Sequence, residues 1–231
     1  MEKKAFEGRY ARNEAMIGQE EQDRLANVVA AVVGLGGLGG HIAEQLARLG
    51  IGSLKLIDCD AVEESNLNRQ LFATEATVGM AKTEAAVRRL ALVNSSVRLE
   101  GISERLEEAN ALTLLSGAEI VFDAVDNVPT RLLLESACRE MAVPLVHGAI
   151  GGWHGQVSFI EPGDDTLSLL YPKGLEKGAE TKFGTPAFAP GLVASIQVAE
   201  GLKYLLGRGE LLRRGLLRID LQANSYTVLH L

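Results

Sequence analysis

Glycines at a defined spacing mark the first candidate binding site in this sequence of 231 residues. An apolar run ending at Val33 is followed by a G-x-G-x-x-G pattern, whose glycines are Gly34, Gly36, Gly37 and Gly39. Between a strand and a helix, such glycines permit a tight turn, and the helix N-terminus offers free N–H groups to phosphate. Asp58 ends the next predicted strand, where a carboxylate can bond ribose hydroxyls. The pattern predicts a nucleotide site, but it does not distinguish NAD from ATP.

Two cations and one further carboxylate favour a triphosphate. Arg69 and Lys82 supply a cationic clamp, which a dinucleotide already bound at the helix N-terminus can do without. Asp126 follows a predicted strand and faces the same carboxyl edge of the sheet, where a carboxylate can hold Mg²⁺ against phosphate oxygens. These residues therefore predict ATP and Mg²⁺ as ligand and metal.

An alternation of strands and helices must position these side chains. Apolar runs and helical periodicity predict strands at 28–33, 53–58, 97–102, 119–125, 144–148, 156–160, 217–221 and 225–231, and helices at 9–26, 38–49, 82–94, 130–141 and 190–206. Gly50 and Gly207 are predicted left-handed helix caps. The β-branched strands indicate a parallel sheet, whereas the later strands alternate polar and apolar residues. The expected fold class is α/β, a Rossmann-like doubly wound sheet whose parallel core is extended by antiparallel strands.

The chain shows no shift in composition that would mark a second domain. Residues 1–231 are therefore predicted to form a single ATP-binding domain. Within it, residues 1–27 form an N-terminal helical segment. Residues 161–185 are rich in Gly and Pro and lack a clear period, so they are predicted to be a structureless crossover loop.

Charge and composition exclude several classes of function. Lys and Arg total 23 against 30 Asp and Glu, and a net charge of −7 argues against bulk electrostatic binding of nucleic acid. No apolar run reaches the roughly 18 residues of a membrane span, and the first residues lack a signal sequence. A cytoplasmic protein is expected. The two cysteines, Cys59 and Cys138, are interpreted as reduced core residues.

The chain resembles the MoeB/ThiF/HesA family, the bacterial relatives of ubiquitin-activating enzymes, over nearly its whole length. The resemblance rests on several motifs in order: Arg9-Tyr10-x-Arg12, Gly34 to Gly39, Leu56-Ile57-Asp58-x-Asp60, Ser65-Asn66-Leu67-Asn68-Arg69-Gln70, Gly79-x-x-Lys82, Asp126-Asn127, Arg131, Gly148-Ala149 and Gly155-Gln156. The family resemblance implies ATP-dependent adenylation of the C-terminal carboxylate of a small ubiquitin-like sulfur-carrier protein ending in Gly-Gly. It also implies Mg²⁺ and a homodimer.

The same resemblance implies roles for individual residues. Gly37 would lie beneath the phosphates and Asp58 would hold the ribose. Asn66, Arg69 and Lys82 would engage the phosphates, and Asp126 would hold Mg²⁺. Arg12 would reach the ATP of the neighbouring subunit. The expected nucleotide-binding set is completed by Ser65, Asn66, Leu67, Asn68 and Asn127.

The sequence departs from the family in its cysteines. Family members commonly carry two C-x-x-C pairs that bind zinc, and this chain has neither pair. Where the first pair is expected, the sequence runs from Leu167 to Pro172 with apolar residues. The segment 180–184 has no thiol for a covalent step. We therefore expect no zinc and the adenylation half-reaction alone, with sulfur delivered by another protein.

Two other classes of function remain open from the sequence. An NAD- or FAD-dependent oxidoreductase would explain the glycine pattern alone. A non-enzymatic adaptor would bind the nucleotide and present a partner without catalysis. Asp60 also keeps two interpretations: it supports Asp58 or Arg69, or it is an exposed acid of a loop. A basic cluster typical of a solvated face is formed by Arg208, Arg213, Arg214 and Arg218.

Overall fold

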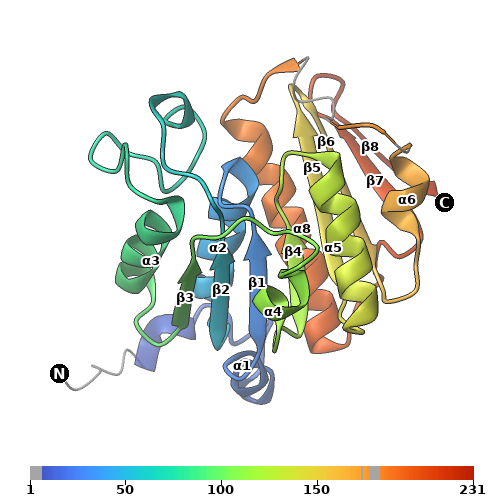
Figure 1. Ribbon diagram of the computed structural model, residues 1–231. Coiled ribbons are helices and arrows are strands. Elements are labelled where there is room, and N and C mark those ends of the chain that lie inside the picture. The colour runs from blue at the N-terminus through green and yellow to red at the C-terminus, as the bar shows by residue number, and fades with distance from the viewer. Residues whose placement is uncertain (1–6, 173, 177–182) are drawn as a thin grey trace.

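One mixed β-sheet forms the centre of the computed structural model, which describes residues 7–172, 174–176 and 183–231 (Figure 1). Within these residues the strand order is β3-β2-β1-β4-β5-β6-β7-β8. The strands are β1 (Val29–Val33), β2 (Ser53–Ile57), β3 (Arg98–Ile102), β4 (Ile120–Asp123), β5 (Leu145–Gly151), β6 (His154–Ile160), β7 (Gly215–Asp220) and β8 (Ser225–His230). Strands β1 to β5 pair in parallel, and β6 to β8 extend the sheet in antiparallel pairs. The predicted fold class is confirmed.

Helices cover both faces of this sheet. The helices are α1 (Gln19–Leu25), α2 (Gly37–Leu49), α3 (Lys82–Val93), α4 (Ala111–Leu115), α5 (Val128–Glu140), α6 (Thr166–Leu170) and α8 (Phe188–Leu206), with short 3₁₀ turns η1 (Glu7–Tyr10) and η2 (Glu64–Asn66). Successive residues of β1 enter different cores: Ala30 and Val32 pack with α2, α3 and α8, whereas Ala31 and Val33 pack with α4, α5 and α6. This alternation follows from the two-residue period of a strand, and it makes the sheet doubly wound.

The helix ends follow the signals in the sequence. Gly50 and Gly207 adopt the left-handed conformation, with φ of 83° and 66°, and close α2 and α8 as predicted. At the start of α5, the Asn127 side chain accepts a hydrogen bond from the Thr130 N–H at 3.0 Å. This cap fixes the direction of the chain immediately after β4, where Asp126 lies.

Two glycines of β5 and β6 allow α8 to lie close against the sheet. A Cβ atom at Gly148 would lie 2.2 Å from the Gln197 side chain, and one at Gly155 would lie 2.4 Å from Val193. Both contacts are far shorter than van der Waals distance. The Gly148-Ala149 and Gly155-Gln156 motifs are therefore explained by helix packing, because only glycine leaves room for α8.

The N-terminal segment differs from the predicted helix over 9–26. Gly18 has extended backbone, and its N–H donates to the Glu21 carboxylate at 3.0 Å, so α1 begins only at Gln19. A 3₁₀ turn and further turns precede it. Residues 1–6 of the predicted N-terminal segment lie outside the described residues.

The predicted crossover loop also differs, because it contains a short helix. Helix α6 lies inside the region 161–185, and residues 173 and 177–182 of that region lie outside the described residues. The carboxylate of Glu135 on α5 accepts hydrogen bonds from the Leu167 N–H at 2.6 Å and from the Ser168 hydroxyl at 2.7 Å. Leu167 is fully buried. A long-range partner thus stabilises a helix that has no signal of its own in the sequence.

Of the remaining predictions, the one for Cys59 is wrong. Cys59 is exposed and follows β2, so it is not a core residue, whereas Cys138 is buried as predicted. Burial raises the pKa of the Cys138 thiol to about 12. The basic cluster lies on a solvated face as predicted, because all four of its arginines are exposed. Arg213 and Arg214 also pair with the buried Asp164, and Arg208 pairs with Glu21. Finally, no helix among the described residues combines the length and apolar character of a membrane span.

Candidate active site

A cavity opens where the parallel strands end, between the turns that follow β1, β2, β3 and β4. Its wall includes the glycine turn at 34–37, the acids at 58–60, residues 104–106 and the turn at 124–127. The strand order reverses between β1 and β4, since β2 lies on one side of β1 and β4 on the other. Ligands of open α/β sheets bind at such a point. The cavity is therefore the candidate site.

The glycines of the first turn divide into two roles. Gly34 has a φ of 89°, and a Cβ atom at Gly39 would lie 1.8 Å from the Gly34 carbonyl oxygen. These two residues therefore shape the turn and bring helix and strand together. Gly36 and Gly37 line the cavity at the N-terminus of α2. Free backbone N–H groups at that end of the helix suit a phosphate group.

Asp58 is held rigidly at the end of β2. Its carboxylate accepts hydrogen bonds from the Leu35 N–H at 2.7 Å and from the Asp60 N–H at 2.8 Å. Burial raises the pKa of Asp58, and the nearby Lys82 opposes that rise. The bond from Leu35 connects the Asp58 carboxylate to the glycine turn. The expected ribose contact and the expected phosphate contact therefore have a fixed geometry relative to each other.

Lys82 projects from the first turn of α3 into the same space. Its Nζ lies 2.9 Å from Oδ2 of Asp60 and 3.8 Å from Oδ1 of Asp58. The hydrogen bond from Lys82 lowers the pKa of Asp60. The Asp60 carboxylate therefore positions Lys82, and the Asp60 N–H supports the Asp58 carboxylate. Asp60 is thus an exposed acid, as one interpretation expected, and its contacts support Asp58 and Lys82 but not Arg69.

Arg69 lines the cavity, but most of its motif does not. Its Nη1 donates to the Ser65 carbonyl at 2.9 Å and to the Asn68 side chain at 2.8 Å. Asn66 is buried and accepts a hydrogen bond from the Glu63 N–H. Of the expected set, Ser65, Asn66, Leu67 and Asn68 are absent from the described cavity wall, whereas Gln70 of the same motif is present. The first four shape the loop that carries Arg69.

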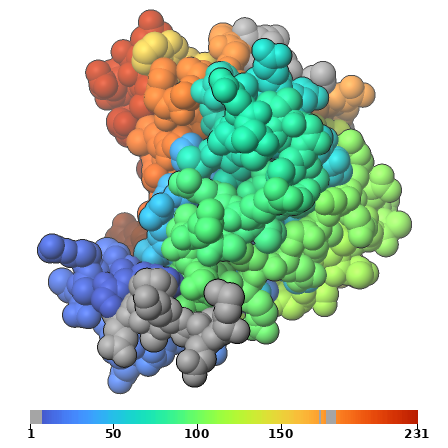
Figure 2. All heavy atoms as spheres, turned by 90° about the vertical axis from the view of Figure 1, so that its left-hand side faces the viewer, coloured from blue at the N-terminus to red at the C-terminus, as the bar shows by residue number. Residues whose placement is uncertain are grey.

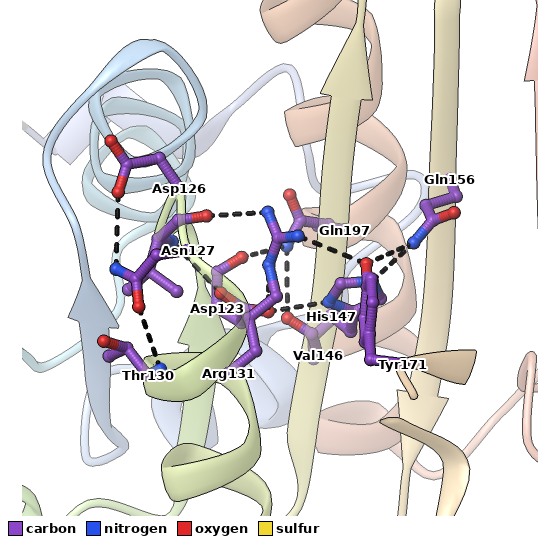
Figure 3. A network of polar contacts seen from close by, with 11 residues as sticks. Asp123, Asp126, Asn127, Thr130, Arg131, Val146, His147, Gln156, Tyr171 and Gln197 are labelled. Atoms are coloured by element: carbon purple, nitrogen blue, oxygen red, sulfur yellow. Dashed lines mark hydrogen bonds and ion pairs between the residues drawn. The ribbon is translucent and has the colours of Figure 1, made fainter. Parts of the chain in front are cut away.

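Asp126 and Asn127 reach the cavity from the turn after β4 (Figure 3). Asn127 donates to the Asp126 carboxylate at 3.4 Å while it caps α5. No ion pair joins Asp126 to any cation of the described chain. A carboxylate on the wall of a cation-lined cavity is a suitable oxygen donor for Mg²⁺. The residues present thus fit the metal that the sequence predicts.

A second acidic cluster fits a metal less well. Among the described residues, ligand atoms of Asp58, Cys59 and Asp60 lie within 4.8 Å of one another. The Lys82 ammonium group already lies among these carboxylates. Because a resident cation supplies the charge that a metal would bring, Asp126 is the better candidate ligand.

Arg12 is not brought to this cavity. It is exposed in the segment after η1, and that segment is fixed by Asn94, whose Nδ2 donates to the Tyr10 hydroxyl at 2.8 Å and whose side chain also bonds Arg9. Asn94 precedes β3, so this contact lies near the amino ends of the strands. Figure 2 shows the blue N-terminal segment at the lower end of the molecule and the teal segment after β2 at the upper end.

The cavity includes residues that the sequence did not single out as binding residues. Residues 104–106 come from the loop after β3, and Thr185 comes from the predicted crossover loop. The others are Cys59, Thr130, Arg131 and Ile150. The loop after β3 could have been expected here, because it also follows a parallel strand at the carboxyl edge. Thr185 has no such signal, since it is placed by the Asn68 side chain, which donates to its carbonyl at 3.1 Å.

Fold and site together define a Rossmann-like nucleotide-binding protein with a cation-lined cavity. The chain belongs to the ThiF family, whose sequence pattern matches residues 10–231. It is 38% identical over 217 residues to the SAMP-activating enzyme E1 of Haloferax volcanii, covering 92% of this chain and 80% of that protein. It is also 38% identical over 219 residues to the sulfur carrier protein adenylyltransferase of Thermus thermophilus, covering 91% of this chain and 81% of that protein.

Solved structures show the same fold. E. coli MccB with ATP has a TM-score of 0.78 at 26% identity, covering 96% of this chain and 71% of that chain. E. coli tRNA N6-threonylcarbamoyladenosine dehydratase, TcdA, in complex with AMP has a TM-score of 0.75 at 26% identity, covering 90% of this chain and 97% of that chain. Both structures hold an adenine nucleotide on this fold.

Proposed function

We propose that this protein is an ATP-dependent adenylyltransferase that activates the C-terminal Gly-Gly carboxylate of a small ubiquitin-like sulfur-carrier protein. One observation carries the proposal: a chain of the ThiF family gathers its glycine turn, Asp58, Arg69, Lys82 and Asp126 around one cavity. The relatives in Haloferax and Thermus, named for SAMP activation and for sulfur carrier protein adenylylation, support this substrate class.

The reaction needs two anions to meet, and the site supplies positive charge. A carboxylate oxygen of the carrier attacks the α-phosphorus of ATP, the bond from that phosphorus to the bridging oxygen breaks, and pyrophosphate leaves with the electron pair. Arg69 and Lys82 neutralise phosphate charge, the α2 N-terminus binds phosphate, and Asp58 accepts from the ribose. Mg²⁺, held by Asp126, would further neutralise the phosphates. No side-chain nucleophile is required, because positioning and charge neutralisation provide the catalysis.

We also propose the assembly in which the reaction takes place. The protein acts as a cytoplasmic homodimer without zinc, and Arg12 reaches the ATP of the neighbouring subunit. The distance of the Arg12 segment from its own cavity supports this arrangement. Sulfur transfer to the activated carrier is the task of another protein.

The test is ATP–pyrophosphate exchange with a purified carrier ending in Gly-Gly, with and without Mg²⁺. We expect exchange that requires both carrier and Mg²⁺, and loss of exchange in Asp126→Asn. Stability provides a second measurement, because a ligand at one hundred times its Kd stabilises a protein by about 2.7 kcal/mol. ATP with Mg²⁺ should therefore raise the Tm, and NAD should not.

Two results would contradict the proposal. Stabilisation by NAD or FAD in place of ATP would indicate an oxidoreductase. Binding of ATP and carrier without any exchange would indicate an adaptor that presents its partner.

A further inference from the structure

A buried polar network, which reaches the cavity wall through Arg131, is not used directly by the proposed reaction (Figure 3). Asp123 and His147 are 0% exposed, and Arg131 is 2% exposed. They come from β4, β5 and α5, and the network is completed by Gln156 of β6 and by Tyr171, which follows α6. Burying polar groups in this number is costly unless their hydrogen bonds are satisfied.

The hydrogen bonds of the network have one consistent direction. His147 Nδ1 lies 2.6 Å from the Asp123 carboxylate, which can only accept, so Nδ1 carries the proton. The Gln156 amide nitrogen, which can only donate, lies 3.0 Å from His147 Nε2, so this Nε2 accepts. Burial also lowers the pKa of His147. Arg131 and Gln156 donate to the Tyr171 oxygen at 3.2 and 2.7 Å. The Tyr171 oxygen lies 3.3 Å from the same Nε2 of His147.

The network ends on the turn that carries Asp126. The Val125 N–H donates to the Asp123 carboxylate at 3.0 Å, and the Val125 carbonyl accepts from Arg131 at 2.8 Å. Both backbone groups of the residue that precedes Asp126 are therefore fixed by side chains of the network. Arg131 and Asp123 therefore hold the backbone from which Asp126 projects.

Tyr171 is the member that connects this turn to the crossover region. Its ring is mostly buried, stands edge-on to the His147 ring at a centroid distance of 5.9 Å, and lies beneath the Arg131 guanidinium at 5.6 Å. Its hydroxyl contacts three different side chains of the network. A single oxygen atom thus contacts Arg131, Gln156 and His147 together.

We propose that Tyr171 is a positioning residue for adenylation: its hydroxyl holds Arg131 and the Nδ1-protonated form of His147, and through them sets the aim of Asp126 at the magnesium nucleotide. The inference rests on the proposed function. The inference extends the proposed function to Tyr171, which lies outside the described cavity wall. The binding of Mg²⁺ then depends on the position of Tyr171.

The test is Tyr171→Phe, which keeps the ring and removes only the hydroxyl. We expect kcat for ATP–pyrophosphate exchange to fall about tenfold, the effect of one lost charge-assisted hydrogen bond. The Mg²⁺ concentration for half-maximal exchange should rise several-fold, while the KM for the carrier stays unchanged. In ¹⁵N spectra of the histidine side chains, the Nε2 resonance of His147 should shift, and its Nδ1 should remain protonated.

Two control variants separate positioning from stability. Leu134→Ala removes packing from the same buried core without touching a polar group of the network, and Tyr204→Phe removes a hydroxyl elsewhere. Both should keep the wild-type Mg²⁺ response. If Tyr171→Phe keeps the wild-type kcat and Mg²⁺ response, the inference is wrong but the proposed function stands. The same holds if Leu134→Ala shows the Mg²⁺ defect expected for Tyr171→Phe. A wild-type protein that neither binds magnesium ATP nor catalyses exchange overturns the proposed function, and the inference with it.

Discussion

At the scale of single residues, the proposed reaction gives Lys82 two kinds of partner in succession. Its ammonium group is held by Asp60 and lies near Asp58 inside the cavity. A bound triphosphate would offer it a larger negative charge at the same place. The two carboxylates therefore keep the lysine directed into the cavity before the nucleotide arrives, and the lysine needs little rearrangement to bind phosphate.

Replacing this lysine gives the first prediction. In Lys82→Ala, ATP–pyrophosphate exchange should fall by roughly 10²–10³, the usual effect of losing one preorganised electrostatic donor. Arg88→Ala is the matched control, because Arg88 lies on the same helix α3 and forms an exposed pair with Glu84. The control should keep wild-type exchange. Equal rates in Lys82→Ala and the wild type would remove Lys82 from the reaction.

Asp164 gives a prediction about pH. Burial would raise the pKa of Asp164, but hydrogen bonds from Arg213 and Arg214 hold that pKa below its usual value. A carboxylate with a depressed folded pKa stabilises the protein above its unfolded pKa, near 3.9, and this stabilisation is lost as the pH falls through the folded pKa. Asp164→Asn should therefore lower the free energy of unfolding at pH 7 by about 1 kcal/mol, after allowance for solvent screening of the arginines.

Denaturation with urea at pH 7 and near pH 3 measures this difference. The gap between wild type and Asp164→Asn should shrink at the lower pH. Asp165→Asn is the control, since Asp165 is an exposed neighbour that pairs with Arg139. A gap that is constant over this pH range would show that the Asp164 charge does not contribute.

The candidate site shows how far single residues could be predicted from the sequence. Asp58 and Asp126 follow parallel strands, and the carboxyl ends of such strands meet at one edge, so their convergence was predictable. Asn66 was assigned to the nucleotide but is absent from the described cavity wall, because its amide closes the turn at Glu63. The contact between His147 and Tyr171 joins distant segments and leaves no local pattern that could have predicted it.

At the scale of elements, periodic segments were predictable and short ones were not. The long helix α8 and the hairpin of β7 and β8 repeat an apolar pattern, so their type was predicted correctly. Helices α4 and α6 have only five residues each, too few for a period to be detected. Their stability comes from tertiary contacts, and such contacts cannot be deduced from the local sequence.

Helix α6 supports a prediction about metal removal. It occupies the place where the family resemblance leads one to expect a zinc-binding pair, and the buried Glu135 carboxylate anchors it through three hydrogen bonds. Glu135→Ala should lower the free energy of unfolding by about 2 kcal/mol, because it leaves buried N–H groups without their acceptor. A strong chelator should leave the Tm of the wild type unchanged, since this anchor contains no metal.

Calorimetry with and without chelator measures both effects. Glu140→Ala is the matched control, because Glu140 is an exposed residue of the same helix α5. That variant should stay within about 0.5 kcal/mol of the wild type. A chelator-induced fall in Tm would indicate a structural metal and contradict the prediction.

At the scale of the whole molecule, the two ends of the sheet carry different parts of the proposed machinery. The cavity lies where the parallel strands end, whereas the segment with Arg12 is fixed near their beginnings (Figures 1 and 2). Within one chain, Arg12 is therefore far from Arg69 and Lys82 of the cavity. A two-fold dimer can remove this separation, because each subunit can offer its N-terminal segment to the other cavity.

Mixed dimers test this arrangement. Arg12→Ala and Asp126→Ala should each abolish most exchange, since each leaves both sites of a homodimer incomplete. If Arg12 acts across the interface, a mixed dimer of the two variants has one complete site, which combines the Asp126 of one subunit with the Arg12 of its partner. Random mixing in equal amounts should then restore about a quarter of the wild-type sites. If Arg12 acted within its own subunit, every site in the mixture would lack one of the two residues. The exchange rate after subunit mixing should therefore rise well above the sum of the rates of the separate variants. The presence of mixed dimers must be shown independently. If they are present and the rate is unchanged, Arg12 does not act in the site of its partner.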